Sequence, residues 1–313
     1  MKWSKNSLKN NQYTGYFAII TANIIFGINI PVTKALISGW LTPQAYTIIR
    51  MIFGCVFFWL IDLRNNNEIP AKKDLLILAF GGLLGFVATQ LTFALSLKYT
   101  TPVNYALMMA LTPVVVLLLS FIFLKEKVNS TKSFGIALSV SGAFIIILKS
   151  HNSSSGSNNL LGILIAILCS VCYGIYLLLT RNVSIKYKPL TVVKWMFLFA
   201  VAFSFPFGVK GITEQKIFTQ LVTMSGVLLL GFSLVFSTVI AFFLMPVALG
   251  KLKASVVSIF MNLQPIVASV TAVIVGQDKF TLDKIFAASL VLIGVYIVTK
   301  KAAFKVDGIN IEN

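Results

Sequence analysis

Arg50 and Lys194 are the two residues of this sequence whose positions are hardest to explain by folding alone. Each lies about two helical turns inside a long apolar segment, where an unpaired charge costs roughly 2.5–3.5 kcal/mol on membrane-insertion scales. Amide, phenol and indole side chains occur in the other apolar segments. The residues that we predict to contact a substrate are Asn23, Asn29, Arg50, Gln90, Tyr105, Tyr173, Tyr176, Lys194, Trp195, Asn262 and Gln264.

Each of these residues also has a purely structural interpretation. Amide side chains in a bilayer often hydrogen-bond one helix to another, at about 0.6 kcal/mol on average, and the two roles are equally plausible for any single amide. Trp195 fits an interfacial aromatic belt as well as a substrate pathway. Long basic side chains can extend to the headgroups. We expect this of Lys34 and Arg181, whereas both roles stay open for Arg50 and Lys194.

The acidic residues are placed where they would not bind a coupling ion at membrane depth. All nine lie in loops or at helix ends, and the single histidine, His151, lies in a polar linker. Proton- and sodium-driven carriers usually hold a carboxylate or histidine within the membrane, so we expect facilitated diffusion or exchange. One basic group near each mouth, with no acid between them, favours a substrate that carries a carboxylate or a phosphate.

The same segments lack the groups that an enzyme or a metal site requires. Cys169 and Cys172 form a CxxC pattern, but no second cysteine or histidine pair completes a metal site. A membrane-embedded protease or lipid-modifying enzyme would need a nucleophile with a base, or a liganded metal. We therefore expect no catalytic residue, no metal and no cofactor.

The composition indicates which elements position these side chains. The chain has 313 residues, 58% hydrophobic and 11% charged, with a mean hydropathy of +0.91. Soluble domains carry about 25% charged residues, so a soluble enzyme, a secreted disulfide scaffold and a single-anchor protein are excluded. Each span needs roughly 20 residues and must pair its own backbone polar groups, which requires helices. We predict an all-α polytopic membrane protein with ten transmembrane helices, at residues 14–35, 43–62, 73–97, 102–124, 133–149, 160–180, 189–209, 219–248, 253–276 and 281–299.

The lysines and arginines predict the orientation of these helices. With the N-terminus in the cytoplasm, 17 of the 26 bases fall in cytoplasmic segments and 6 in external ones. Cytoplasmic loops are enriched in bases, so we expect both termini in the cytoplasm and the protein in the inner (plasma) membrane. Nucleic acid is not an expected partner, because no basic stretch outside the spans carries aromatic stacking residues. The expected partners are the lipid bilayer and a small-molecule substrate, with a homodimer left open.

The two halves of the chain resemble each other in sequence. The aromatic-Gly, Thr and base of Phe26-Gly-Ile-Asn-Ile-Pro-Val-Thr-Lys34 align with those of Tyr173-Gly-Ile-Tyr-Leu-Leu-Leu-Thr-Arg181, and Leu111-Thr-Pro113 aligns with Leu263-Gln-Pro265. This indicates one five-helix unit at residues 1–150, a polar linker at 151–159 and a second unit at 160–313. Because five is odd, the second unit enters the membrane inverted. Inverted repeats are typical of transporters that bind substrate near the midplane, here in a central cavity.

The aromatic-Gly with a base seven residues later, Pro113 in the fourth helix and the Leu-Lys-Glu126 after it resemble the EamA-type drug/metabolite transporter superfamily. The resemblance covers about residues 14–300. It departs from the usual pattern at Phe26, where the family has tryptophan, and at Asp278. The resemblance implies ten helices, a cavity lined by both halves and movement of small metabolites, commonly outward.

Three functional hypotheses follow. The first is a carrier that exports amino acids or related amphiphilic metabolites by alternating access between the two units. The second is an exchanger of anionic or phosphorylated metabolites, which the bases would also suit. The third is a membrane scaffold without a transported substrate, which predicts no substrate-dependent counterflow in liposomes.

Overall fold

The computed structural model describes residues 5–63, 68–124, 130–150, 158–208, 212, 215–219, 224–279 and 281–304. Within these residues the regular structure is helical, as expected. Three features of the sequence analysis lie outside them: Glu126 with the adjoining Lys125, His151 with the linker residues 151–157, and the chain ends with their bases.

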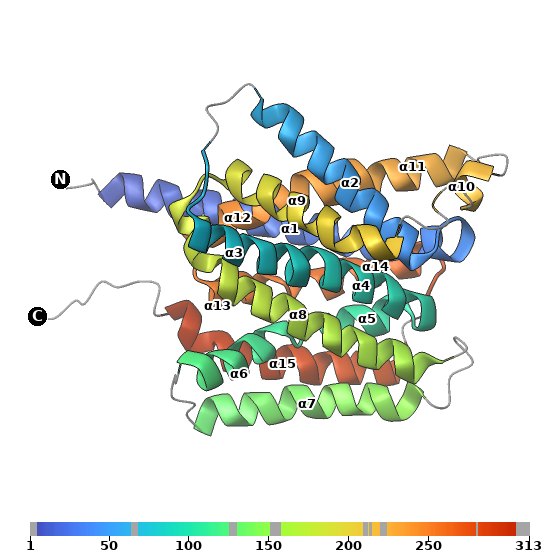
Figure 1. Cartoon of the computed structure of the whole chain (residues 1–313). Helices are drawn as coiled ribbons and strands as arrows, with labels where there is room; N and C mark the ends of the chain where they lie inside the picture. Colours follow the sequence, from blue (N-terminus) through green and yellow to red (C-terminus); the bar gives the residue numbers. More distant parts are fainter. Residues whose placement is uncertain are drawn as a thin grey trace, which may run out of the picture.

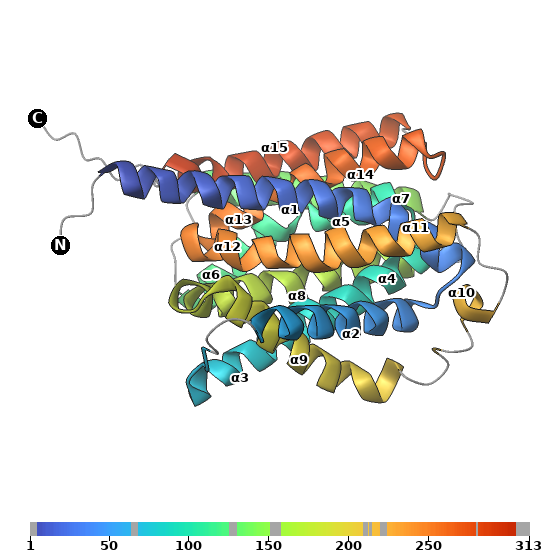
Figure 2. The same ribbon diagram turned by 90° about the horizontal axis from the view of Figure 1, so that it is seen from above.

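The helices lie side by side in one bundle, and the start of the first lies at the same end of the bundle as the close of the last (Figure 1, Figure 2). The elements are α1 Lys5–Gly39, α2 Pro43–Asp62, α3 Lys72–Gly81, η1 Gly82–Ala88, α4 Thr89–Tyr99, α5 Pro102–Met109, α6 Thr112–Leu124, α7 Ser130–Ser150, α8 Asn159–Lys186, α9 Pro189–Gly208, α10 Lys216–Thr219, α11 Met224–Phe232, η2 Ser233–Ala241, α12 Phe242–Lys251, α13 Ala254–Phe260, α14 Leu263–Ile274 and α15 Leu282–Phe304.

Eight stretches of helix within the described residues are long and apolar enough to cross a membrane. They correspond to eight of the ten expected spans. The other two correspond to α15 and to α7, whose apolar part, Ser133–Leu148, is shorter. The eight stretches are Gln12–Gly39, Pro43–Asp62, Lys72–Tyr99, Pro102–Ile122, Asn159–Lys186, Pro189–Pro206, Met224–Lys251 and Val256–Ile274.

Four of these stretches depart from a straight α-helix. The third and the seventh each contain a π-helical segment, η1 and η2, in which the backbone holds extra residues per turn. Two others break ahead of a proline: one between α5 and α6 before Pro113, and one between α13 and α14 before Pro265. Proline has no N–H for the carbonyl four residues earlier. At the first break the Thr112 hydroxyl donates to that carbonyl, Met109 O, at 2.7 Å.

Helices α7 and α15 pack closely because glycines remove the side chains between them. A Cβ at Gly142 would lie 2.7 Å from the Ala287 carbonyl oxygen, and one at Gly294 would lie 2.6 Å from the Gly135 carbonyl oxygen. The Ser139 hydroxyl donates across the same interface to Val291 O at 3.3 Å. Figure 1 shows the two helices side by side at one edge of the bundle.

Adding a methyl group at this interface tests the packing. We expect Gly142→Ala and Gly294→Ala to destabilise the protein by about 1–3 kcal/mol, because the helix backbones must move apart. Gly231→Ala is the matched control, since no atom lies within 4 Å of a Cβ there. Thermal unfolding in detergent measures the effect. Equal melting temperatures for the three variants would show that close approach of α7 and α15 is not required.

Candidate functional site

A cavity lies between the helices near the middle of the bundle. It encloses about 510 Å³ of space between atoms, with open space at its mouth included, and its wall mixes aromatic rings, thioethers and a few amides. This combination suits a small ligand with an apolar body and a few polar groups. The lining residues are Phe26, Asn29, Ile30, Thr89, Gln90, Phe93, Tyr105, Met109, Tyr173, Tyr176, Phe242, Met245, Met261 and Gln264.

The structure brings six of the eleven candidate residues to this cavity wall. They are Asn29, Gln90, Tyr105, Tyr173, Tyr176 and Gln264. Arg50 and Asn23 lie one hydrogen bond behind the wall, whereas Lys194, Trp195 and Asn262 are not part of it. Asn262 follows Met261 in the break before α14, and its side-chain oxygen has no partner among the described residues. Contact of any of these residues with a substrate stays a prediction.

Arg50 on α2 is completely buried and is held by uncharged partners. Its Nε donates to Thr238 Oγ1 at 2.7 Å and one terminal nitrogen donates to Ser237 Oγ at 2.8 Å. The other terminal nitrogen donates to Gln90 Oε1. The guanidinium also lies 5.2 Å from the ring centre of Tyr46 and 5.6 Å from that of Phe242, close enough for cation–π attraction. No ion pair to Arg50 is found in the part of the chain that the structure describes.

The π-helical segment η2 supplies the hydroxyl groups around Arg50. Thr238 Oγ1 donates to the Ser233 carbonyl five residues earlier, at 2.9 Å, and so can accept from Arg50. The Ser233 hydroxyl bonds to the Tyr46 hydroxyl at 2.5 Å. Tyr46 in turn bonds to Thr33 at 2.7 Å and accepts from Asn29 Nδ2 at 3.2 Å. A continuous polar network therefore runs from the buried charge to the cavity wall.

A second network reaches the cavity wall at Gln264. Asn23 Nδ2 donates to the Ile19 carbonyl at 2.8 Å, and Asn23 Oδ1 accepts from Gln264 Nε2 at 2.6 Å. This bond joins α1 to α14, which approach closely at Gly27, because a Cβ there would lie 2.8 Å from Val267 Cβ. Asn23 therefore links α1 to α14 by a hydrogen bond and also holds Gln264, which lines the cavity.

The tyrosines of the wall present their rings and have weak hydroxyl partners. Tyr105 OH lies 3.4 Å from Cys169 Sγ, and Tyr173 OH donates to Met245 Sδ at 3.6 Å. The rings of Tyr173 and Tyr176 lie 5.3 Å apart on the same face of α8. Sulfur is a weak acceptor, so these hydroxyls keep capacity to bond a polar ligand.

Lys194 has an acidic partner that the sequence analysis did not expect. It forms an ion pair with Asp62, and both residues are buried, at 2% and 4% exposed. Trp59 and Trp195 flank the ammonium, with ring centres 5.1 and 6.0 Å from Nζ. Asp62 is the last residue of α2, which agrees with the expectation that the acids lie in loops or at helix ends. Its carboxylate, however, faces α9 in the protein interior. The expectation that the two bases have no acid between them is therefore wrong for Lys194.

The Asp62–Lys194 pair is one of several polar contacts between α2–α3 and α8–α9. Asp74 accepts from Lys186 and from the Tyr187 hydroxyl, each at 2.6 Å. Glu68 accepts from the Thr191 hydroxyl at 2.7 Å. In Figure 1 these helix ends lie at the same end of the bundle as the start of α1. The contacts join the first half of the chain to the second at that end.

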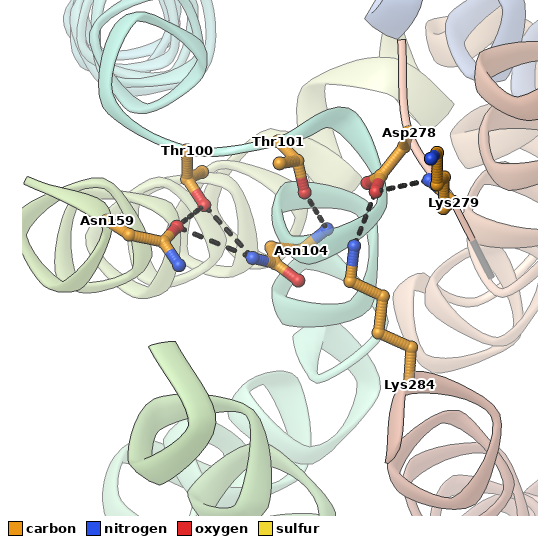
Figure 3. A network of polar contacts seen from close by, with 7 residues as sticks. All are labelled: Thr100, Thr101, Asn104, Asn159, Asp278, Lys279 and Lys284. Carbon is orange, nitrogen blue, oxygen red and sulfur yellow. Dashed lines mark hydrogen bonds and ion pairs between the residues drawn. The ribbon is translucent and has the colours of Figure 1, made fainter. Parts of the chain in front are cut away.

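Polar residues also gather where α4 ends and α8 begins, at the other end of the bundle (Figure 1), and Figure 3 shows them from close by. Asn104 Nδ2 donates to Thr100 at 3.3 Å and to Asn159 at 3.4 Å. Beside them Asp278 accepts from Lys284 at 2.5 Å and from the Lys279 amide at 2.7 Å.

Lys34 donates to the carbonyls of Leu97 and Thr100, at 2.6 and 3.0 Å. A cation is favourable at such a helix C-terminus, here that of α4. The expected extension of Lys34 to lipid headgroups is therefore wrong. For Arg181, the other residue of that expectation, one terminal nitrogen is buried without a partner among the described residues.

The polar residues around the cavity that the sequence did not point to are mostly ones with a side-chain hydroxyl group. Thr33, Tyr46, Ser233, Ser237 and Thr238 surround Arg50 and Asn29, yet serine and threonine are common in membrane helices, where they bond to their own backbone. One signal was present: Ser233, Ser237 and Thr238 form a polar cluster within an otherwise apolar segment. Asp62 was missed because the end of a helix is an ordinary position for an interfacial acid.

The matching family and two curated relatives are transporters by name. The EamA-like transporter family matches residues 13–148 and 160–300. An uncharacterized transporter of Bacillus subtilis (strain 168), YetK, is 24% identical over 94% of this chain and 89% of its own length. An uncharacterized transporter of Archaeoglobus fulgidus is 27% identical over 84% of this chain and 90% of its own. A protein crystal structure has the same fold, with a TM-score of 0.61 and 16% identity over 96% of this chain and 99% of that one.

The Asp62–Lys194 pair predicts a non-additive effect of mutations. Asp62→Asn or Lys194→Met alone should destabilise the protein by about 3–5 kcal/mol, because each leaves a buried charge without its partner. The double variant should recover most of this loss, since it removes both charges. Melting temperatures of the four proteins in detergent measure the coupling. Additive losses would show that the two side chains do not depend on each other.

Proposed function

We propose a substrate class, a direction and a mechanism for this chain, which belongs to the EamA-like transporter family and is a multi-pass membrane transporter. The substrates are small amphiphilic metabolites such as amino acids or their derivatives. The chain exports them across the inner membrane by exposing the central cavity to one side at a time, as two inverted five-helix units rock against each other. Ten helices cross the membrane, with α7 and α15 as the fifth and tenth.

One observation carries this proposal: the cavity wall is built from matching positions of the two halves. Positions that align in the sequence repeat lie 147 residues apart in the first helix of each half and 152 apart in the later helices. Ten of the fourteen lining residues fall into pairs at these spacings. The pairs are Phe26 with Tyr173, Asn29 with Tyr176, Gln90 with Phe242, Phe93 with Met245, and Met109 with Met261.

Contacts between helices repeat at the same spacings, which supports an inverted duplication. Gly27 approaches Val267, and the matching Gly174 approaches Val115. The segments η1 and η2 occupy matching parts of their halves. Further matched pairs of contacts are Asn23–Gln264 with Ser170–Thr112, Gly15–Leu252 with Gly162–Thr100, and the reciprocal contacts of Gly142 and Gly294 between α7 and α15.

The chemistry of the wall supports an amphiphilic substrate. Within the pairs, the first half contributes the amides Asn29 and Gln90. The second half has the aromatic residues Tyr176 and Phe242 at the positions that align with them. Phenyl rings and thioethers suit an apolar body, and the amides suit polar groups.

A second candidate, an exchanger of anionic or phosphorylated metabolites, is favoured by one observation. Arg50 is buried behind Gln90 without an acidic partner among the described residues.

We also propose that transport runs by facilitated movement or exchange, with both termini in the cytoplasm. The acids that the structure describes lie at helix ends or in loops, and the carboxylate buried between α2 and α9, that of Asp62, is already neutralised by Lys194. Neither arrangement offers a free carboxylate for a coupling proton.

Metabolites in the growth medium test the proposed function. Cells that express the protein should accumulate one class of compound in the medium relative to cells with empty vector. Arg50→Glu should abolish this accumulation for an anionic or zwitterionic substrate, because the reversed charge repels the acidic group. Lys98→Glu, an exposed base in α4, is the matched control and should leave it unchanged. Expression level in the membrane normalises the variants.

The other outcomes separate the alternatives. Accumulation with both wild type and Arg50→Glu would retain an exporter but remove the role of the base. No accumulation, together with no counterflow of amino acids or of phosphorylated metabolites in proteoliposomes, would favour the scaffold. Counterflow of phosphorylated metabolites alone would favour the exchanger.

A further inference from the structure

Two glutamines in the cavity wall have amide groups whose orientation is set by the residues behind them. Gln90, on α4, and Gln264, on α14, come from different halves of the chain and both line the cavity. A free amide can turn over and exchange its donor for its acceptor. Whether it does so depends on the partner that it bonds.

Arg50 determines which way Gln90 points. A guanidinium has five N–H donors and no acceptor, so the atom of Gln90 that meets it must be the carbonyl oxygen, Oε1. Turning the amide over would place an NH2 group against the cation and lose a charge-assisted hydrogen bond. The NH2 group of Gln90 is therefore the part left for the cavity. It is a donor, and the positive charge behind it strengthens it as one.

Asn23 determines the opposite orientation for Gln264. The Ile19 carbonyl only accepts, so the Asn23 atom that meets it must be the NH2 group, Nδ2. Asn23 Oδ1 is then the atom that faces Gln264, and it accepts from Gln264 Nε2 at 2.6 Å. This leaves the carbonyl oxygen of Gln264 for the cavity. A main-chain carbonyl thus fixes, through one asparagine, an acceptor in the wall.

Asn29, the other amide in the wall, is oriented by two hydroxyl groups. Its partners are the hydroxyls of Thr33 and Tyr46, at 3.1 and 3.2 Å. The amide nitrogen donates to both hydroxyls, which also share a hydrogen bond with each other at 2.7 Å. Turning the amide over would use the one hydrogen of each hydroxyl and leave the bond between them without a donor. The donor and the acceptor that are free to meet a ligand in the cavity are therefore those of Gln90 and Gln264.

We propose that Arg50 and Asn23 are positioning residues that give the cavity a fixed polarity, with a donor at Gln90 and an acceptor at Gln264. The cavity then selects a small amphiphile with a hydrogen-bond acceptor, preferably anionic, at one end and a donor at the other. Phe26, Phe93 and Phe242 contact the apolar body between these ends. The inference rests on the proposed function, because it assumes that this cavity holds the substrate.

Three probes that share one apolar body test this polarity. L-Phenylalanine carries an acceptor and a donor, 3-phenylpropanoate carries only the carboxylate, and phenethylamine carries only the ammonium. Binding of each to the full-length protein in detergent is measured by isothermal titration calorimetry. The variants are Arg50→Met, which frees the Gln90 amide, and Asn23→Leu, which frees the Gln264 amide. Gln90→Leu and Gln264→Leu remove the two wall amides directly and serve if either first variant folds poorly.

The expected result is a crossed pattern. Arg50→Met and Gln90→Leu weaken binding of L-phenylalanine and 3-phenylpropanoate about tenfold and leave that of phenethylamine within about twofold, because only the carboxylate loses its hydrogen-bond donor. Asn23→Leu and Gln264→Leu weaken L-phenylalanine and phenethylamine and leave 3-phenylpropanoate. Gln277→Leu, whose amide donates to Pro31 O away from the wall, is the control and weakens none selectively.

A merely structural role would produce a different pattern. If every variant weakens all three probes by the same factor, Arg50 and Asn23 support the fold and do not set polarity, and the inference is overturned. It is also overturned if none of the probes binds the wild-type protein. That result leaves the proposed function standing on its own test, because accumulation of metabolites in the medium does not depend on these three compounds.

Discussion

Polar groups at the centre of this molecule depend on partners within the chain or in the cavity, because the surrounding hydrocarbon offers none. The guanidinium of Arg50 is the most demanding of these groups, since it is fully buried and charged. Its partners come from three separate stretches: Ser237 and Thr238 on η2, Gln90 after η1, and the ring of Tyr46 on its own helix. The arrangement of α2 against these segments follows from the need to satisfy one side chain.

The same constraint explains how the helices meet. Apolar side chains gain little from leaving lipid for protein, so helix contacts in membranes depend on close backbone approach and on hydrogen bonds. Glycines allow the approach where α1 meets α14 at Gly27 and where α7 meets α15 at Gly142. Short polar side chains such as Ser139 add bonds at these places. The cavity lies where this close packing is interrupted by larger residues from both halves.

The sequence predicted the helices well because the length of an apolar run is itself the physical requirement for a span. The duplicated motifs predict which helices correspond, and this stays a prediction. The amides Gln90 and Gln264 were singled out because an amide within an apolar run is costly, and both line the cavity. The partners of the charges were not predictable in the same way. Lys194 meets Asp62 across 132 residues of chain, and no local pattern encodes that contact. The hydroxyls around Arg50 were missed because only the wider turns of η2 orient Ser233 and Thr238 to the same network.

The two π segments have a consequence for how the sequence can vary. Each residue advances an α-helix by about 100°, so a helical wheel drawn through Met224–Lys251 as one regular helix goes out of phase after η2. Loss of one residue from this segment would turn α11 relative to α12 by about 100°. The lipid-facing side of α11 would then no longer be continuous with the lipid-facing side of α12. Natural length variation in this helix should therefore be rare, and where it occurs it should come with a matching change at the position of Arg50.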